Sequence, residues 1–162
     1  TTAPELPATT LAEDCYFSMF YGCTALTTAP ELPATTLAND CYRGMFSDCT
    51  SLTTAPKLPA TTLANDCYGY MFDSCTSLTT APNLPATTLA AGCYQYMFYN
   101  CTKLNYIMML ATNIRASLYL DNWVLGVAST GTFIKHPNMT SLSTGSSGIP
   151  TGWATYNVDY YK

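Results

Sequence analysis

The sequence predicts an α/β solenoid, built from short parallel strands and short helices, with a small α+β module at the C-terminal end. Three observations lead to this fold. One repeated unit begins at Thr1 and returns at Thr27, Thr53 and Thr79, each unit changes from a strand-like to a helix-like stretch, and the repetition stops after Leu104. A single unit is too small to bury its own apolar face, so the copies must stack to form a core.

The four copies span residues 1–26, 27–52, 53–78 and 79–104, here called copies 1 to 4, and 18 of their 26 positions are identical in all four. Equivalent positions in stacked copies differ freely only where packing does not decide the side chain. The variable positions are therefore expected on the surface. The invariant apolar positions are the expected core, and in copy 2 they are Ala29, Leu32, Leu37, Ala38, Cys41, Met45, Phe46, Cys49 and Leu52.

Each copy is expected to contain one strand and one helix. Between Asp40 and Cys49, apolar residues occur at i, i+4, i+5 and i+8, which is the stripe of a short helix, and Asp40 suits the N-cap. The stretch from Leu52 to Pro56 is rich in threonine and predicts a short strand that ends at the proline, because proline has no N–H for a sheet. A strand and a short helix in a unit of this size indicate a leucine-rich-repeat solenoid.

Residues 105–162 are expected to form a separate C-terminal module, because this part contains both Trp residues of the chain and no Cys. Tyr106 to Ala111 is predicted to add one more strand to the stack. The apolar spacing from Ser117 to Val127 predicts an amphipathic helix over the open end of copy 4. Side chains alternate along residues 131–135 and 153–161, which predicts two more strands. The whole module is therefore expected to cap the end of the stack.

A family resemblance is carried by Met45-Phe46, followed two residues later by the string from Cys49 to Thr53. This pattern resembles the phenylalanine, cysteine and leucine positions of BspA-like leucine-rich repeats, and segments 126–133 and 148–153 look like the C-terminal end of such proteins. Members are known chiefly as surface proteins of anaerobic bacteria, so the resemblance implies adhesion and binding of host proteins. It transfers no binding residue, because the family motif consists of core positions.

Composition excludes several classes of function. Only 10% of the residues are charged and the net charge is −4, so neither nucleic acid nor an anionic lipid surface is an expected partner. The longest apolar run, Ile107 to Ala111, is far shorter than the roughly 20 residues of a membrane-spanning helix. The single His, His136, lies next to Pro137 with no acid or nucleophile placed beside it by any pattern. We therefore expect no enzyme, no catalytic residue and no cofactor.

The start of the chain has no initiator Met, no basic region and no apolar region of a signal peptide. We therefore expect a processed product or an excised fragment.

All eight cysteines lie in two invariant columns, Cys15, Cys41, Cys67 and Cys93 in the first and Cys23, Cys49, Cys75 and Cys101 in the second. Two Cys eight residues apart on a helix are separated by about 12 Å of rise, which exceeds the roughly 7 Å Cα distance that a disulfide allows. We expect buried free thiols, and disulfides are the alternative if the helix is broken. Metal is not expected, because zinc sites use more closely spaced ligand pairs.

Candidate partner contacts are variable positions, because no packing column explains them. One set occupies the fifth position of each copy and consists of Glu5, Glu31, Lys57 and Asn83. The other set consists of the variable aromatic residues of the predicted helices, Phe17, Tyr21, Tyr70, Tyr96 and Tyr99. The invariant tyrosines are expected to stack on one another and to point their hydroxyls to water; they are Tyr16, Tyr42, Tyr68 and Tyr94.

The variable positions on an invariant scaffold predict a non-enzymatic adhesion module, and the family resemblance implies that it lies outside the cell or on a bacterial cell surface. Its expected partner is a protein or glycan on a host or neighbouring cell, bound by the sum of weak contacts from several copies. The alternative is a phage virion protein, a fibre or head-decoration component, in which the repeats serve assembly or host attachment. The identity of the neighbouring genes would distinguish the two.

Overall fold

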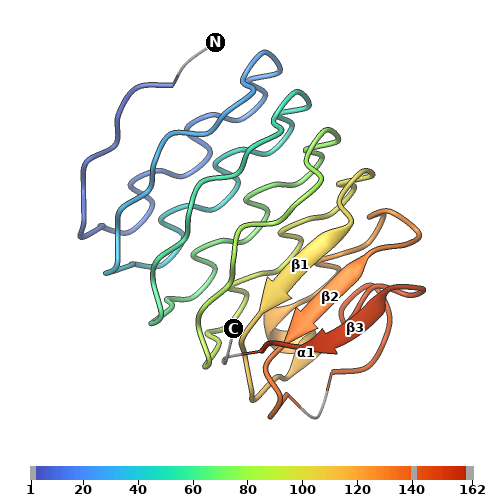
Figure 1. The fold of residues 1–162 in the computed structure, drawn as a ribbon. Helices are drawn as coiled ribbons and strands as arrows, with labels where there is room; N and C mark the ends of the chain where they lie inside the picture. The colour runs from blue at the N-terminus through green and yellow to red at the C-terminus, as the bar shows by residue number, and fades with distance from the viewer. Residues whose placement is uncertain (1–2, 140–141, 160–162) are drawn as a thin grey trace.

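The computed structural model describes residues 3–139 and 142–159. Within these residues it contains β1 (Tyr106–Met109), α1 (Ala116–Tyr119), β2 (Thr132–Lys135) and β3 (Ala154–Asn157). The three strands form one parallel sheet in the order β1-β2-β3, as Figure 1 shows. The fold therefore contains a small parallel sheet and almost no helix.

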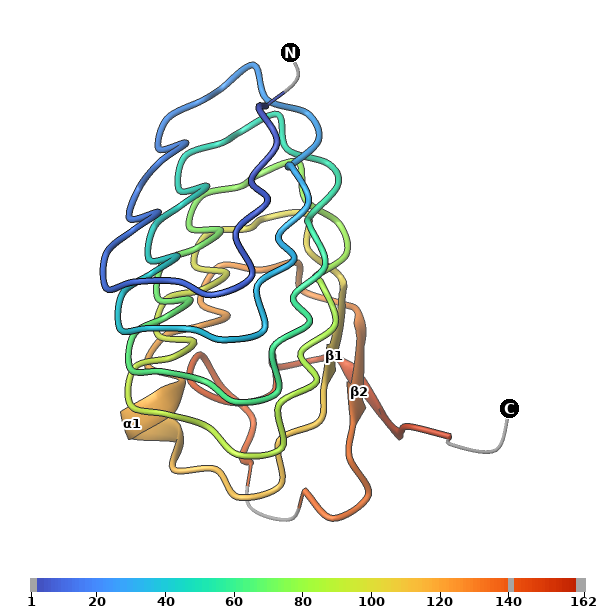
Figure 2. The same ribbon diagram turned by 90° about the vertical axis from the view of Figure 1, so that its left-hand side faces the viewer.

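The four copies lie next to one another in sequence order, and the C-terminal sheet lies at the far end from copy 1 (Figures 1 and 2). Isolated parallel bridges join them, Thr10 to Thr36 and Thr28 to Thr54 among others. The strand predicted from Leu52 to Pro56 is reduced to the single bridge at Thr54. The strand predicted after copy 4 is confirmed as β1, which forms the sheet with β2 and β3.

The helix predicted in each copy is wrong, and a series of turns replaces it. We call this part the turn segment; it spans 12–23 in copy 1 and the equivalent residues of the other copies. In copy 2, the N–H groups of Tyr42 and Gly44 donate to the carbonyls of Cys67 and Gly69 in copy 3. Those of Arg43 and Met45 donate to carbonyls three residues earlier in copy 2 itself, and the same alternation continues along the segment. A helix cannot form, because every second N–H is bonded to the neighbouring copy.

Left-handed backbone conformations recur every fourth residue of the turn segment. In copy 2 the φ angles of Asp40, Gly44 and Asp48 are 53°, 61° and 60°. Asp, Asn and Gly tolerate this region better than other residues. Asp40 therefore occupies a left-handed corner and does not cap a helix. The four-residue spacing of Cys41, Met45 and Cys49, which suggested a helix, instead matches the period of these turns.

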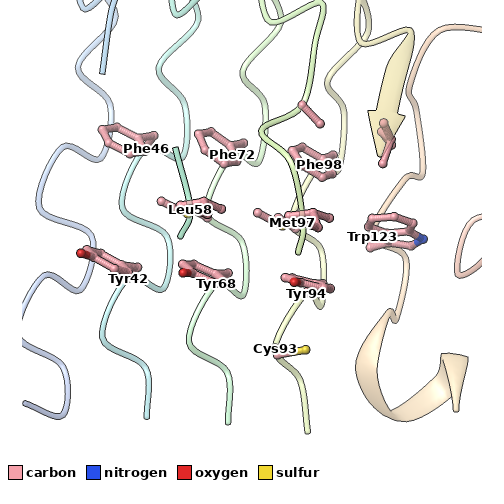
Figure 3. Packing of buried hydrophobic residues seen from close by; sticks show 14 of the residues in the cluster. Tyr42, Phe46, Leu58, Tyr68, Phe72, Cys93, Tyr94, Met97, Phe98 and Trp123 are labelled. Atoms are coloured by element: carbon pink, nitrogen blue, oxygen red, sulfur yellow. The ribbon is translucent and has the colours of Figure 1, made fainter. Parts of the chain in front are cut away.

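The invariant side chains form continuous columns through the core, as Figure 3 shows. The rings of Phe20, Phe46, Phe72 and Phe98 stack with centroids 5.6–5.7 Å apart, and the invariant tyrosines stack at 5.7–6.2 Å. Trp123 ends both columns, 6.0 Å from Phe98 and 6.5 Å from Tyr94. The prediction that the tyrosine hydroxyls point to water is wrong for Tyr42 and Tyr68, whose hydroxyl oxygens are buried and have no partner among the described residues.

All eight cysteines are free thiols, as expected, although the helix that motivated the expectation is absent. Six of them are fully buried. In the second column each buried thiol donates to the carbonyl of a Phe in the preceding copy, as Cys49 does to Phe20 at 3.1 Å and Cys101 to Phe72 at 3.0 Å. Burial raises the pKa of Cys41 and of Cys49 to about 11 and that of Cys93 to about 12. These thiols are part of the packing.

The amphipathic helix predicted from Ser117 to Val127 is also wrong. Helix α1 ends at Tyr119, and the following residues form turns that continue the pattern of the copies. Phe98 N–H donates to the Trp123 carbonyl at 2.8 Å, and Trp123 Nε1 donates to the Gly148 carbonyl at 2.8 Å. The predicted strands 131–135 and 153–161 appear as the shorter β2 and β3, and residues 160–161 lie outside the described residues.

Candidate functional site

Three adjacent turn segments form an open groove of about 320 Å³ on the molecular surface. We call it the aromatic–acidic groove, and it is lined by Phe17, Ser18, Tyr21, Arg43, Gly44, Ser47, Asp48, Tyr70 and Asp73. The invariant Cys, Tyr, Met and Phe side chains of the turn segments point to the core in copies 2 to 4, so the variable positions of these segments face outward. Phe17 is 50% exposed and Tyr21 is 61% exposed. The fold thus brings three of the predicted contact residues, from copies 1 and 3, to one place.

Arg43 forms a fixed wall of this groove. Its Nη1 donates to Asp40 Oδ1 at 2.9 Å and lies 3.8 Å from Asp66 Oδ1 in the next copy. The guanidinium carbon lies 5.3 Å from the centroid of the Tyr70 ring, which is the geometry of a cation–π contact. The hydrogen bond to Asp40 raises the pKa of Arg43 above its ordinary value. Contacts with three different residues therefore hold this side chain in one position.

An aromatic row extends from the groove across copies 3 and 4. The rings of Tyr70 and Tyr96 are stacked, with centroids 4.8 Å apart and planes at 7°. Tyr99 meets Tyr96 at 5.5 Å and 58°, and Asn122 Nδ2 donates to the Tyr96 hydroxyl at 3.2 Å. The five predicted aromatic contacts thus lie along one surface, and three of them support one another directly.

Asp48 and Asp73 give the groove its negative charge. They come from adjacent copies, and the described residues show an ion pair for neither of them. Partial burial raises the pKa of Asp73 and the charge of Asp48 raises it further, whereas the 2.8 Å hydrogen bond from Ser74 Oγ lowers it. A hydrogen bond to Asp48 raises the pKa of the Tyr21 hydroxyl. The groove therefore offers exposed aromatic faces beside carboxylate acceptors.

Arg43, Asp48 and Asp73 line the groove but were not predicted from the sequence. All three occupy variable positions of the turn segment, so the same signal that selected the aromatics was present for them. The sequence did not show which positions of successive copies lie next to each other. A helix exposes a different set of side chains from the turns that the structure contains.

The candidate contacts at the fifth position of each copy line different pockets and are not part of the groove. Glu5 and Glu31 line a pocket of about 270 Å³ between copies 1 and 2, together with four prolines. Lys57 and Asn83 line the corresponding pocket of about 390 Å³ between copies 3 and 4. These pockets lie on the proline-rich connections, and their charge differs from one pair of copies to the next.

The described residues contain no group of three His, Cys, Asp or Glu side chains placed to hold a metal ion. His136 lies far along the chain from the groove residues, and its Nδ1 accepts a hydrogen bond from the Asn138 N–H at 3.0 Å. Among the helices of the described part, none has the length and apolar character to span a membrane.

Comparisons of the chain with family models, with curated proteins and with solved structures gave no match.

Proposed function

We propose that the chain is a non-enzymatic adhesion module of the BspA-like leucine-rich-repeat kind, displayed on a bacterial cell surface, and that the aromatic–acidic groove is its partner site. One observation carries this proposal: variable residues of three successive copies converge on one groove, whereas the invariant Cys, Tyr, Met and Phe side chains of the turn segments are buried in copies 2 to 4. A scaffold with fixed packing and variable exposed positions suits a protein whose partner is selected by surface residues alone.

The architecture supports a solenoid in which turns replace the helix of the usual leucine-rich repeat. Backbone hydrogen bonds join each turn segment to the equivalent residues of the next copy, and the sheet at the C-terminal end is parallel. Both features are expected of a solenoid in which each repeat forms one coil of the chain and each coil stacks on the preceding one.

The groove fits a protein or glycan partner of modest affinity. The exposed faces of Phe17 and Tyr21 offer apolar area for a sugar ring or an apolar side chain. The carboxylates of Asp48 and Asp73 can accept hydrogen bonds from sugar hydroxyls or from Lys and Arg side chains. Because each copy contributes few contacts, several groups must bind together for useful strength.

The test is binding of the labelled chain to an array of mammalian glycans and to immobilised human fibronectin and mucin. We expect Tyr70→Ala and the pair Asp48→Asn with Asp73→Asn to weaken binding by roughly tenfold, a loss of about 1.4 kcal/mol. The matched controls are Lys57→Ala and Asn83→Ala, which alter the other candidate pocket and should leave binding unchanged. The proposal would be contradicted if the chain bound none of these probes. It would also be contradicted if the groove variants and the control variants lost equal affinity.

A further inference from the structure

The outer side of copy 1 is an open core surface, which we call the N-terminal face. Met19 is 46% exposed, whereas Met45, Met71 and Met97 at the equivalent position are 0% exposed. Cys15 and Cys23 are exposed, and the other six cysteines are buried. In Figure 2 copy 1 forms the end of the row of copies. Side chains that are core elsewhere in the molecule therefore face solvent here.

Alternate backbone carbonyls of this face also have no backbone donor among the described residues. Within copy 2, the carbonyls of Cys41, Arg43 and Met45 accept N–H groups of copy 1 at 3.0, 2.9 and 2.9 Å. The equivalent carbonyls of Cys15, Phe17 and Met19 accept no backbone hydrogen bond from the described residues. The turn segment of copy 1 thus presents a row of carbonyl acceptors, at alternate residues, on the N-terminal face.

A third feature concerns the thiols of the second column. Cys49, Cys75 and Cys101 each donate to the carbonyl of a Phe in the preceding copy. Cys23 has no such acceptor among the described residues. A cavity of about 420 Å³, lined in part by Phe20, Cys23 and Leu26, opens at the same place.

These groups define the occupant that would complete the face. Two N-terminal faces placed together would set acceptors against acceptors, which gives no hydrogen bonds. A second intact molecule also lacks the matching donors, because the alternate N–H groups of copies 1 to 4 already bond to the next copy or, in copy 4, to residues 118–125. A further unit of the repeat sequence has these donors free, together with a Phe carbonyl for Cys23.

We propose that the N-terminal face is a docking site for one more unit of the repeat sequence, placed in the register that joins copies 1 and 2. Its alternate N–H groups donate to the carbonyls of Cys15, Phe17 and Met19, and its Met and Cys side chains cover the exposed ones. The two surfaces share Phe17, whose side chain lines the aromatic–acidic groove and whose carbonyl lies on the N-terminal face. The inference rests on backbone acceptors and buried-type side chains, so it does not depend on the adhesion proposal.

The experiment compares the chain with an extended chain that carries the sequence of residues 27–52 directly before Thr1. A maleimide reagent labels the native proteins, and mass spectrometry follows each cysteine. In the chain itself Cys15 and Cys23 should react quickly and the six buried cysteines slowly. In the extended chain, labelling of Cys15 and Cys23 should become slower by roughly tenfold or more, because reaction then requires local opening.

The matched control is an extension of the same composition and length in scrambled order, which should leave Cys15 and Cys23 as reactive as in the chain itself. Sedimentation of the unextended chain reports whether its own N-terminal faces associate. Unchanged reactivity in the extended chain, equal protection by the scrambled extension, or a dimer of the unextended chain with both thiols protected would each overturn the proposal.

Discussion

Replacing Phe72 by Ala tests whether the stacked columns hold the fold together. Phe72 is 0% exposed and lies between Phe46 and Phe98, with both ring centroids 5.7 Å away. Removing a buried Phe side chain costs about 3–5 kcal/mol, and two lost ring pairs, each worth about 0.5–1.5 kcal/mol, favour the upper part of that range. Phe20 is the matched comparison, because it has the same position in copy 1, a single ring neighbour in its column and 9% exposure. Its replacement by Ala should cost roughly 2–3 kcal/mol.

The assay is urea unfolding followed by tryptophan fluorescence, since Trp123 lies against the last ring of the column. Small proteins have a total stability of about 5–15 kcal/mol, so Phe72→Ala can approach the limit of folding. Phe72→Leu, with an expected cost of roughly 1–2 kcal/mol, keeps the comparison measurable. Equal losses for Phe20→Ala and Phe72→Ala would refute the reasoning, because the number of ring neighbours would then not matter.

Four further results are expected. Arg43→Ala should cost about 0.5–1 kcal/mol in the same assay, because its ion pair is partly exposed, and Lys57→Ala should cost nearly nothing. Trp123→Ala should cost about 3–5 kcal/mol, since this buried residue ends both ring columns. A thiol reagent should count about eight free cysteines after denaturation without reductant, and a count near zero would contradict the free thiols. Stability should fall as pH rises from about 9 to 11: the unfolded thiol of Cys41 ionises near its ordinary pKa of 9.0, whereas the folded one keeps its proton until about 11. The loss is roughly 2 kcal/mol for such a thiol at pH 11, and urea midpoints at pH 8, 9, 10 and 11 measure it.

The period and most of the core columns were predictable from the sequence, because invariant apolar positions such as Cys41, Met45 and Phe46 are buried where copies pack on both sides. The prediction was only partly right for Ala29, Leu37 and Ala38, which are half-buried. The absence of a helix from each copy was not predictable from the spacing of apolar residues alone. Cys41, Met45 and Cys49 are four residues apart, and over so short a segment a period of four cannot be distinguished from the 3.6 of a helix. The better signal was chemical: the positions of Asp40 and Asp48 hold Asp, Asn, Gly or Ser in all four copies, and they are left-handed corners that a helix does not contain.

The candidate site was predictable in part for a related reason. The variable aromatic positions identified Phe17 and Tyr21, which are exposed, and Tyr70, which is half-buried, and all three line the groove. The meeting of Asp48 and Asp73 from neighbouring copies depends on the turn geometry, which the wrong helix concealed. Glu5 and the other fifth-position residues were selected by the same criterion, but they lie on the proline-rich connections and face separate pockets.

The alternate hydrogen bonds of the turn segments run in one sense, with donors toward the C-terminal end and acceptors toward the N-terminal end. The backbone bonding between turn segments is therefore the same at every junction between copies, and unequal recombination that deletes or duplicates a whole copy leaves this bonding matched. Chain length can then change in steps of one whole copy without a new interface having to evolve. Because the groove is assembled from variable positions of three consecutive copies, each such event also places different residues side by side, and one genetic step alters the binding surface.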